Sequence, residues 1–246
     1  MKTYLARGLF VTGTDTGVGK SVVTGGLAGL LRKQGINVGV MKPVETGCLH
    51  DDGSFLPADA QFLKDMSGAD EPLEEIVPYQ FKEPLAPSVA AEGEGIMIDS
   101  NHLVKKFERL SQHHDVMLVE GAGGLLVPLC QKFLFIDLVK RFKLPVLIVS
   151  RATLGTINHT LLTLWAARAA KVPVAGIVIN NLSQERNIAA ETNPEAIARV
   201  VDVPVWGVLP YQAEIRPHSS CRETITKLVL RHINAHYLSN LMPTKA

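Results

Sequence analysis

Short apolar runs alternate with amphipathic stretches along the whole chain. The apolar runs are rich in Val, Ile and Leu with few polar interruptions, which is typical of strands buried on both faces of a parallel sheet. They predict six strands, at residues 9–12, 38–41, 116–119, 146–149, 174–179 and 205–209. Apolar residues at helical spacing between them predict helices at residues 20–34, 58–66, 101–113, 136–142, 156–170 and 194–200.

The regular alternation of strand and helix predicts an α/β fold of the P-loop NTPase type. We expect a doubly wound, mostly parallel sheet with helices on both faces and right-handed crossovers. No linker, low-complexity tract or repeat divides the chain, so residues 1–246 are expected to form a single domain. Residues 71–95 are rich in Pro, Glu and Gly and predict a loop-rich surface excursion. Helical spacing within residues 222–240 predicts a closing helix packed on the sheet.

Bulk properties exclude several classes of protein. Of the 246 residues, 46% are hydrophobic and 20% are charged, as expected for a folded globular protein. A net charge of +1 gives no electrostatic preference for nucleic acid or acidic membranes. No apolar run approaches the length of about 18 residues that a membrane span needs. Residues 1–7 are not followed by the long apolar stretch of a secretory signal.

The three cysteines indicate a reducing compartment. Cys48, Cys130 and Cys221 are odd in number and far apart in the sequence, which argues against a disulfide framework. None belongs to a C-x-x-C pair, so we expect neither a zinc site nor a redox site.

A glycine-rich segment joins the first predicted strand to the first predicted helix. It reads Gly13-Thr14-Asp15-Thr16-Gly17-Val18-Gly19-Lys20-Ser21. Backbone N–H groups of such a turn and the open end of the helix point at an anion. The lysine adds a mobile positive charge, and the serine hydroxyl can reach a magnesium ion. Gly13 precedes Gly19 by one residue more than in the common G-x-x-x-x-G-K-[ST] form, so the segment is a variant phosphate loop.

Three further polar side chains are expected near this loop, because ligands of an open parallel sheet bind outside the carboxyl ends of its strands. Lys42 follows the second strand, is pinned by Pro43, and can stabilise a transferring phosphoryl group. Glu120 follows the third strand, where a carboxylate can hold magnesium, and the glycines after it permit close backbone approach to a substrate. Asp59, taken alone, is an ordinary helix-start aspartate.

Two later segments carry weaker signals. Residues 155–158 open a predicted helix, whose free N–H groups can hold a carboxylate. Asn180 follows the strand at 174–179, where its amide can donate to and accept from a nucleotide base.

Together these segments resemble the dethiobiotin synthetase family. The resemblance rests on V-T-G-T-D-T at 11–16, V-G-K-S at 18–21, K-P-V at 42–44, E-G-A-G-G at 120–124 and G-x-I-N-H at 155–159. It covers about residues 9–210. Gly17 stands where family members often carry an acidic residue, and Ser21 replaces their usual threonine while keeping the hydroxyl.

The resemblance implies an enzyme of biotin biosynthesis. It would carboxylate 7,8-diaminopelargonate with CO2 and close the ring to dethiobiotin, using ATP and releasing ADP and phosphate. The route would run through a carbamate and a carbamic–phosphoric anhydride. The family is a cytoplasmic homodimer that requires Mg²⁺, with no nucleic-acid or membrane partner.

The resemblance also implies roles for individual residues. Magnesium would be held by Ser21, Asp59 and Glu120. The catalytic side chains that line the phosphates and the carbamate would be Thr16, Lys20 and Lys42. The nucleotide would contact Gly13, Thr14, Asp15, Gly17, Val18, Gly19, Lys20, Ser21, Asn180, Leu209 and Pro210. The diamine would contact Lys42, Thr46, Glu120, Gly121, Ala122, Gly123 and Gly124, and its carboxylate would meet Gly155, Thr156, Ile157 and Asn158 across the dimer interface.

Three alternative functions share features with the chain. Partition or positioning ATPases that act on DNA or membranes share a variant phosphate loop, but they carry a signature lysine five residues before the position of Lys20, where this chain has Asp15. ATP-dependent amide ligases such as cobyrinate diamide synthases need an ammonia source, usually a glutaminase domain with a reactive cysteine. A degenerate nucleotide-binding subunit is disfavoured by the intact phosphate loop and Glu120.

Overall fold

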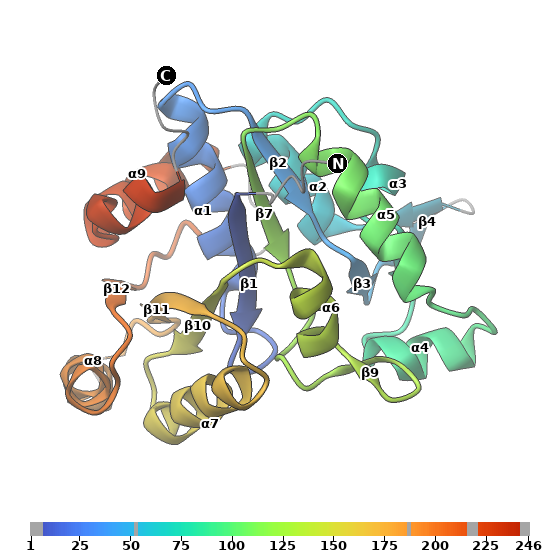
Figure 1. Ribbon diagram of the computed structural model, residues 1–246. Coiled ribbons are helices and arrows are strands. Elements are labelled where there is room, and N and C mark those ends of the chain that lie inside the picture. Colours follow the sequence, from blue (N-terminus) through green and yellow to red (C-terminus); the bar gives the residue numbers. More distant parts are fainter. Residues whose placement is uncertain (1–6, 52–53, 186–187, 216–220, 242–246) are drawn as a thin grey trace.

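A six-stranded parallel sheet forms the centre of the computed structural model, which describes residues 7–51, 54–185, 188–215 and 221–241 (Figure 1). Its strands are β1 (Gly8–Gly13), β2 (Val38–Met41), β7 (Val116–Glu120), β10 (Val146–Arg151), β11 (Val174–Asn180) and β12 (Val205–Leu209). They lie in the order β12-β11-β10-β1-β7-β2, and every neighbouring pair is parallel. All six strands predicted from the apolar runs belong to this sheet, which confirms the predicted fold class.

The strand order places an open crevice beside β1. The connection after β1 leads to the side of the sheet that holds β7 and β2. The connections after β7 and β10 lead to the opposite side, which holds β10, β11 and β12, so the connections diverge at the carboxyl edge beside β1. Ligands of doubly wound sheets bind at such a switch point. All six residues of β1 are buried, as expected for the central strand.

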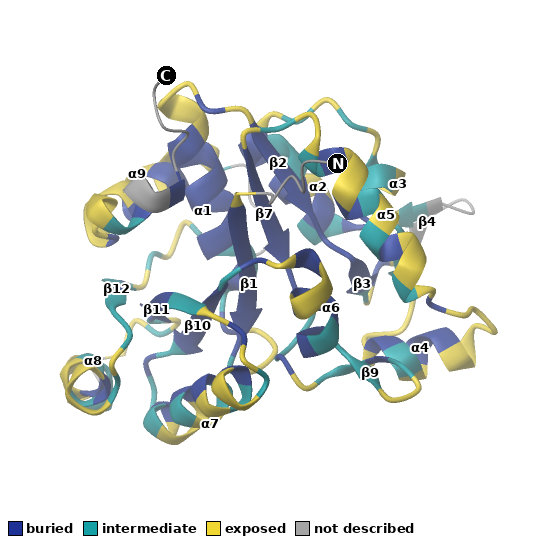
Figure 2. Ribbon diagram, in the orientation of Figure 1, coloured by how far each residue is buried: buried dark blue, intermediate teal, exposed yellow. Residues whose placement is uncertain are grey.

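Helices cover both faces of the sheet, with their buried sides against it and their exposed sides outward (Figure 2). One face carries α1 (Lys20–Lys33), α2 (Ala58–Ser67) and α9 (Arg222–His232), and the other carries α5 (Ser100–Ser111), α6 (Phe135–Phe142), α7 (Thr156–Ala169) and α8 (Ile188–Val200). Side chains of β1 alternate between the two apolar clusters, because Leu9 and Val11 belong to the first and Phe10 to the second.

Helix α1 packs closely against its two neighbours. A Cβ atom at Gly26 would lie 2.3 Å from Val229 Cγ2 of α9, and one at Gly25 would lie 2.4 Å from Phe62 Cε1 of α2. Glycine therefore permits an approach that a side chain would prevent. The approach fixes α1, whose first turn carries the end of the phosphate loop, between α2 and α9.

Two predicted helices have different limits. The helix predicted at 194–200 begins six residues earlier, at Ile188, and contains Pro194 in its interior. This proline has no N–H to donate to the helix, so the hydrogen-bond ladder of α8 is interrupted there. The closing helix predicted at 222–240 ends at His232, since Ile233 forms an antiparallel bridge with Gly207 before a 3₁₀ helix, η1 (Ala235–Leu241).

Several short elements were not predicted. The excursion at 71–95 contains α3 (Leu73–Ile76), β6 (Tyr79–Phe81) and α4 (Pro87–Gly93), so it is more structured than its composition indicates. The remaining short strands are β3 (Val44–Thr46), which pairs with β6, the hairpin of β4 (Leu49–Asp51) and β5 (Ser54–Leu56), and the hairpin of β8 (Pro128–Cys130) and β9 (Phe133–Leu134). Strands of two or three residues and helices of four to seven residues are too short to produce a detectable hydrophobic period.

No helix within the described parts of the chain has the length and apolar character needed to cross a bilayer.

Candidate active site

A cavity of about 670 Å³ opens at the carboxyl ends of the central strands. Many of the residues singled out from the sequence line it. They are Thr16, Gly17, Gly19, Lys20, Ser21, Lys42, Thr46, Asp59, Glu120, Ala122, Gly123, Asn180 and Pro210. The volume is in the range of small-molecule and cofactor sites. The fold thus brings the phosphate loop, Lys42 and both carboxylates into one space.

The phosphate loop connects β1 to α1 with its backbone N–H groups available. Gly17 and Gly19 have φ angles of 72° and 91°, a left-handed conformation that favours glycine. Gly19 is the N-cap of α1 and provides no side-chain cap, so the open end of the helix faces the cavity. These features make an anion-binding site.

Lys20 folds back over this loop. Its Nζ donates to the carbonyl oxygen of Asp15 at 3.2 Å, and its side chain is buried. Burial lowers the pKa of Lys20 to about 8, although Glu120 opposes this shift. A bound phosphate would favour the charged form of this lysine.

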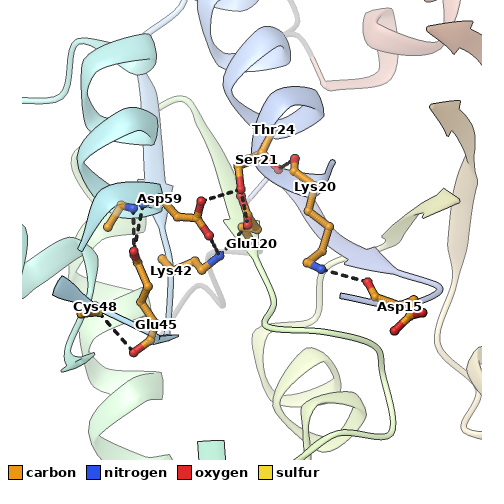
Figure 3. A network of polar contacts seen from close by, with 10 residues as sticks. Asp15, Lys20, Ser21, Thr24, Lys42, Glu45, Cys48, Asp59 and Glu120 are labelled. Atoms are coloured by element: carbon orange, nitrogen blue, oxygen red, sulfur yellow. Dashed lines mark hydrogen bonds and ion pairs between the residues drawn. The ribbon is translucent and has the colours of Figure 1, made fainter. Parts of the chain in front are cut away.

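Four side chains from separate elements meet beside the loop (Figure 3). The Ser21 Oγ atom of α1 lies 2.9 Å from Asp59 Oδ1 of α2 and 3.0 Å from Glu120 Oε1 at the end of β7. The Lys42 Nζ atom donates to Asp59 Oδ2 at 2.6 Å and to Glu120 Oε1 at 2.5 Å. Lys42 is 3% exposed and Glu120 is fully buried.

This cluster keeps Lys42 positively charged. Burial alone would lower the pKa of Lys42, but the carboxylates of Glu120 and Asp59 outweigh burial and hold that pKa above its usual range. Burial raises the pKa of Glu120, and Lys42 opposes that shift. Two carboxylates face one ammonium group here, so the cluster attracts a further cation.

The donor set fits a magnesium ion. A hydroxyl and two carboxylates are hard oxygen ligands of the kind that Mg²⁺ prefers. Glu120 Oε2 is buried and has no hydrogen-bond partner, so it is available as a ligand. Within the described ranges, no group of three or more His, Cys, Asp or Glu side chains could hold a metal alone. A magnesium ion at Ser21, Asp59 and Glu120 would therefore need phosphate or water oxygens to complete its coordination.

The loop after β7 is tied to the phosphate loop. Gly13 N donates to Gly123 O at 3.2 Å, and Gly121 N donates to Val11 O at 3.0 Å. Neither Gly121 nor Gly124 lines the cavity, and the same holds for Gly13, Thr14, Asp15 and Val18 of the phosphate loop. Gly13 and Gly121 act through these backbone hydrogen bonds, which hold the two loops together. Asp15 is exposed and forms an ion pair with Arg151.

Asn180 lies where the sequence predicted a base-binding amide. It ends β11, is buried, and donates from Nδ2 to the carbonyl of Val18 at 3.0 Å. Pro210 follows β12 and lines the cavity, whereas Leu209 is buried and accepts a hydrogen bond from Asn181 N at 2.9 Å. The amide of Asn180 thus links the phosphate loop to the expected adenine side of the cavity.

One predicted segment lies apart from the cavity. Gly155 is the N-cap of α7, and Thr156, Ile157 and Asn158 form the first turn of that helix. None of them lines the cavity, and Gly155 and Asn158 are exposed at the surface. Their assignment to a substrate bound by a second subunit stays a prediction.

Other cavity residues were not predicted. Glu45 of β3 is buried and accepts hydrogen bonds from the backbone N–H groups of Asp59 and Ala60, both at 2.9 Å. Burial raises the pKa of Glu45 to about 7. Apolar side chains of α2 and α9 add one wall: Phe62, Ile225 and Leu228. The residue types gave no signal, because these contacts depend on how distant elements pack.

Sequence comparisons agree with the motifs. A profile of the family described as "AAA domain" matches residues 7–219. The ATP-dependent dethiobiotin synthetase BioD of Thermodesulfovibrio yellowstonii is 46% identical over 219 residues, which are 86% of this chain and 91% of that protein. The ATP-dependent dethiobiotin synthetase BioD of Bacillus subtilis subsp. natto is 42% identical over 238 residues, covering 96% of this chain and 99% of that protein.

Solved structures support the fold alone. The chain is similar to the MinC:MinD cell division protein complex of Aquifex aeolicus, with a TM-score of 0.58, 14% identity, and coverage of 98% of this chain and 99% of the other. It is also similar to a ParA family ATPase of Chlorobium tepidum, with a TM-score of 0.54, 15% identity, and coverage of 91% and 97%.

Proposed function

The chain belongs to the ATP-dependent dethiobiotin synthetase family, and from that premise we propose how its cavity carries out the reaction. It is an ATP-dependent ligase that forms dethiobiotin in biotin biosynthesis. We propose 7,8-diaminopelargonate, CO2 and ATP as its substrates, and ADP and phosphate as the other products. The proposal is carried by the convergence of Lys20, Ser21, Lys42, Asp59 and Glu120 on one cavity.

The nucleotide would bind along the phosphate loop. The backbone N–H groups around Gly19 and the N-terminus of α1 offer donors to the phosphates, and Lys20 would contact the terminal phosphates. Asn180 and the backbone at Leu209 and Pro210 would hold adenine. Thr16 of the phosphate loop, which lines the cavity and is exposed, would also contact the phosphates.

Ser21, Asp59 and Glu120 would hold the magnesium ion. When bound, this ion supplies positive charge to the phosphates and so favours phosphoryl transfer. Lys42 would then face the substrate, because its two carboxylate partners would be shared with the ion. A buried, charged lysine beside the transferred group stabilises the negative charge that develops there.

The chemistry needs positioning more than a protein nucleophile. One amine of the substrate attacks CO2 and loses a proton, which gives a carbamate. A carbamate oxygen takes the γ-phosphoryl group of ATP, forming the carbamic–phosphoric anhydride and ADP. The second amine attacks the carbonyl carbon, loses a proton, expels phosphate and closes the five-membered urea ring. Lys20 and Lys42 neutralise charge in the phosphoryl step, and the cavity holds both amines beside the same carbon, which can contribute about 7–11 kcal/mol.

The diamine would lie between β3 and the loop after β7. Thr46 and Ala122 line the cavity together with Lys42, and Gly123 allows the backbone to approach. The substrate carboxylate would meet the free N–H groups at the start of α7 of a second subunit. This assignment would make the active form a homodimer.

The exposed surface around α7 supports such a homodimer. Trp165 is 71% exposed and Leu162 is also exposed on α7, and Leu154 is 88% exposed just before it. An apolar surface of this kind favours contact with another protein surface. We further propose a cytoplasmic location, supported by the three free cysteines.

A product analysis tests the proposed function. The protein is incubated with 7,8-diaminopelargonate, bicarbonate, Mg²⁺ and ATP, and the mixture is examined by mass spectrometry for the cyclic urea. We expect dethiobiotin and ADP in equal amounts, with no stimulation of ATP hydrolysis by DNA or lipid vesicles. Hydrolysis that responds to DNA or lipid, without formation of the urea, would favour the partition ATPase alternative.

A further inference from the structure

We propose that Glu45 is a positioning residue that fixes the first turn of α2, and thereby the carboxylate of Asp59, at the metal site. The inference rests on the proposed function, because Asp59 is one of the three proposed magnesium ligands. Glu45 is not itself a proposed ligand. It acts on the reaction through the helix that carries Asp59.

Helix α2 begins without a cap of its own. Its N-cap residue is Pro57, whose side chain makes no capping hydrogen bond. Glu45, on strand β3, supplies the missing acceptors: Oε1 accepts from Asp59 N and Oε2 from Ala60 N, each at 2.9 Å. Both oxygens of one carboxylate thus pair with the open end of the helix. Negative charge at a helix N-terminus is also favoured by the helix dipole.

Glu45 is held in place from its own side. It is 6% exposed, and its backbone pairs with Gln80 in the parallel contact between β3 and β6. Its carbonyl accepts a weak hydrogen bond from Cys48 Sγ at 3.6 Å. The capping carboxylate is thus carried by a buried, hydrogen-bonded strand, which ties the first turn of α2 to β3.

The amide and the carboxylate of Asp59 are both engaged. Its N–H donates to Glu45, while its carboxylate oxygens lie 2.9 Å from Ser21 Oγ and 2.6 Å from Lys42 Nζ. Figure 3 shows Glu45 on one side of the start of α2 and the Ser21, Lys42 and Glu120 cluster on the other. Without Glu45, the part-buried N–H group of Asp59 and the buried N–H group of Ala60 would lose their acceptors and the first turn would loosen. The Asp59 carboxylate would then lose its fixed position relative to Ser21 and Glu120.

A binding measurement separates this role from a general effect on folding. Mn²⁺ serves as the probe ion, and free Mn²⁺ is followed by electron paramagnetic resonance in the presence of ADP. The proteins compared are the wild type, Glu45→Gln, Asp59→Asn and the double variant. The Glu45→Gln substitution keeps the size of the native side chain, but its amide group would place a donor against a backbone N–H.

A matched control is available at α5. Asp99 is its N-cap residue, and Asp99 Oδ1 accepts from Asn101 N at 2.8 Å. This cap lies on the other face of the sheet from α2, and Asp99 does not line the cavity. Asp99→Ala therefore removes a helix cap without touching the site. We expect it to leave Mn²⁺ binding unchanged.

The expected result is a Kd for Mn²⁺ that rises about 10- to 100-fold in Glu45→Gln, as is usual when a partner of a metal ligand is lost. The double variant should bind no more weakly than Asp59→Asn alone, because Glu45 acts through Asp59. Wild-type affinity in Glu45→Gln, or a further loss in the double variant, would overturn the inference. Should Glu45→Gln fail to fold, Glu45→Asp, which shortens the side chain and keeps its charge, is judged by the same two criteria.

The proposed function is tested separately by the same experiment. Failure of the wild type to bind Mn²⁺ with ADP, or wild-type binding in Asp59→Asn, contradicts the metal site itself. A normal loss in Asp59→Asn, with no loss in Glu45→Gln, contradicts only the positioning role.

Discussion

Lys42 balances the charge of the cavity, and its removal should affect both activity and stability. Lys42→Ala leaves the buried carboxylate of Glu120 and the partly exposed carboxylate of Asp59 without their cation. We expect the loss of dethiobiotin formation and a fall of about 3 kcal/mol in the free energy of unfolding, measured by urea titration without Mg²⁺. Addition of Mg²⁺ should restore part of the lost stability, because the ion supplies positive charge to the same carboxylates.

Two further variants complete this test. Lys132 is exposed and lies outside the cavity lining, so Lys132→Ala should change the unfolding free energy by no more than about 0.5 kcal/mol. Lys20→Ala should also stop turnover. Its stability loss should be smaller, because the Lys20 amine donates to a backbone carbonyl, whereas the Lys42 amine forms ion pairs with two carboxylates. Near-normal turnover in Lys42→Ala would remove this lysine from the chemistry.

Most of the polar side chains in the cavity could be singled out from the sequence. Lys42 and Glu120 directly follow apolar runs, and the carboxyl ends of parallel strands share one edge of the sheet. Glu45 could not be found in this way, since its partner is a helix terminus fourteen residues further along the chain. The ion pairs of Lys42 with Asp59 and Glu120 could not be predicted either, because residue type and position in the sequence do not determine which side chains meet.

The packing of α1 against α9 gives a prediction about helix contacts. Gly26→Ala adds a Cβ atom 2.3 Å from Val229 Cγ2. Such overpacking costs about 1–3 kcal/mol, more than the roughly 1 kcal/mol that alanine gains over glycine within a helix. We expect Gly26→Ala to lower the melting temperature in calorimetry.

A second glycine provides the opposite expectation. Gly93 lies in the last turn of α4, and a Cβ atom there would meet nothing within 4 Å. Gly93→Ala should therefore raise stability by about 0.4–1 kcal/mol. A melting temperature for Gly26→Ala equal to or above that of Gly93→Ala would show that α9 packs less tightly than the structure indicates.

The contact between α3 and α5 gives a pH dependence of stability. Glu75 of α3 accepts from Lys106 Nζ of α5 at 2.6 Å, and this bond lowers the pKa of Glu75. A carboxyl whose pKa is lower in the folded state stabilises the fold above its unfolded pKa, and this contribution is lost as pH falls through the folded pKa. Glu75→Gln should cost about 0.5–1 kcal/mol at pH 7, and this cost should disappear as the pH falls through the lowered pKa of Glu75, measured by urea titration.

The control for this pH dependence is a neighbouring glutamate. Glu74 is exposed on the same helix, so Glu74→Gln should unfold like the wild type across this pH range. A difference between Glu75→Gln and the wild type that persists unchanged at acid pH would contradict the ion pair as its cause.

The six long strands could be predicted because each produces a continuous apolar run. The short pairs β3–β6, β4–β5 and β8–β9 could not, since strands of two or three residues have no detectable period. Pro194 misled the prediction of α8, because a proline usually marks the start of a helix and here lies inside one. The short strands give no local signal, and at Pro194 packing in the folded chain overrides the signal that the proline gives.

The assembled protein is expected to be a dimer formed through the exposed side of α7 and the residues just before it. Trp165→Glu places a charge on the exposed apolar side of that helix and should convert a dimer into a monomer in analytical ultracentrifugation. We expect it to weaken binding of the diamine while ATP binding persists. Leu230→Glu, on the exposed side of α9, is the matched control and should stay dimeric. A wild type that sediments as a monomer would contradict the assignment of residues 155–158 to the substrate.

The most direct test of the proposed chemistry follows the oxygen atoms of bicarbonate. Bicarbonate labelled with ¹⁸O is added to the protein with 7,8-diaminopelargonate, Mg²⁺ and ATP in ordinary water, and the reaction is stopped before the label exchanges with the solvent. If the carbamate oxygen takes the γ-phosphoryl group, one ¹⁸O atom appears in the released phosphate and one in the carbonyl of the urea. Released phosphate that carries no ¹⁸O would show that water, and not a carbamate, receives the phosphoryl group in this cavity.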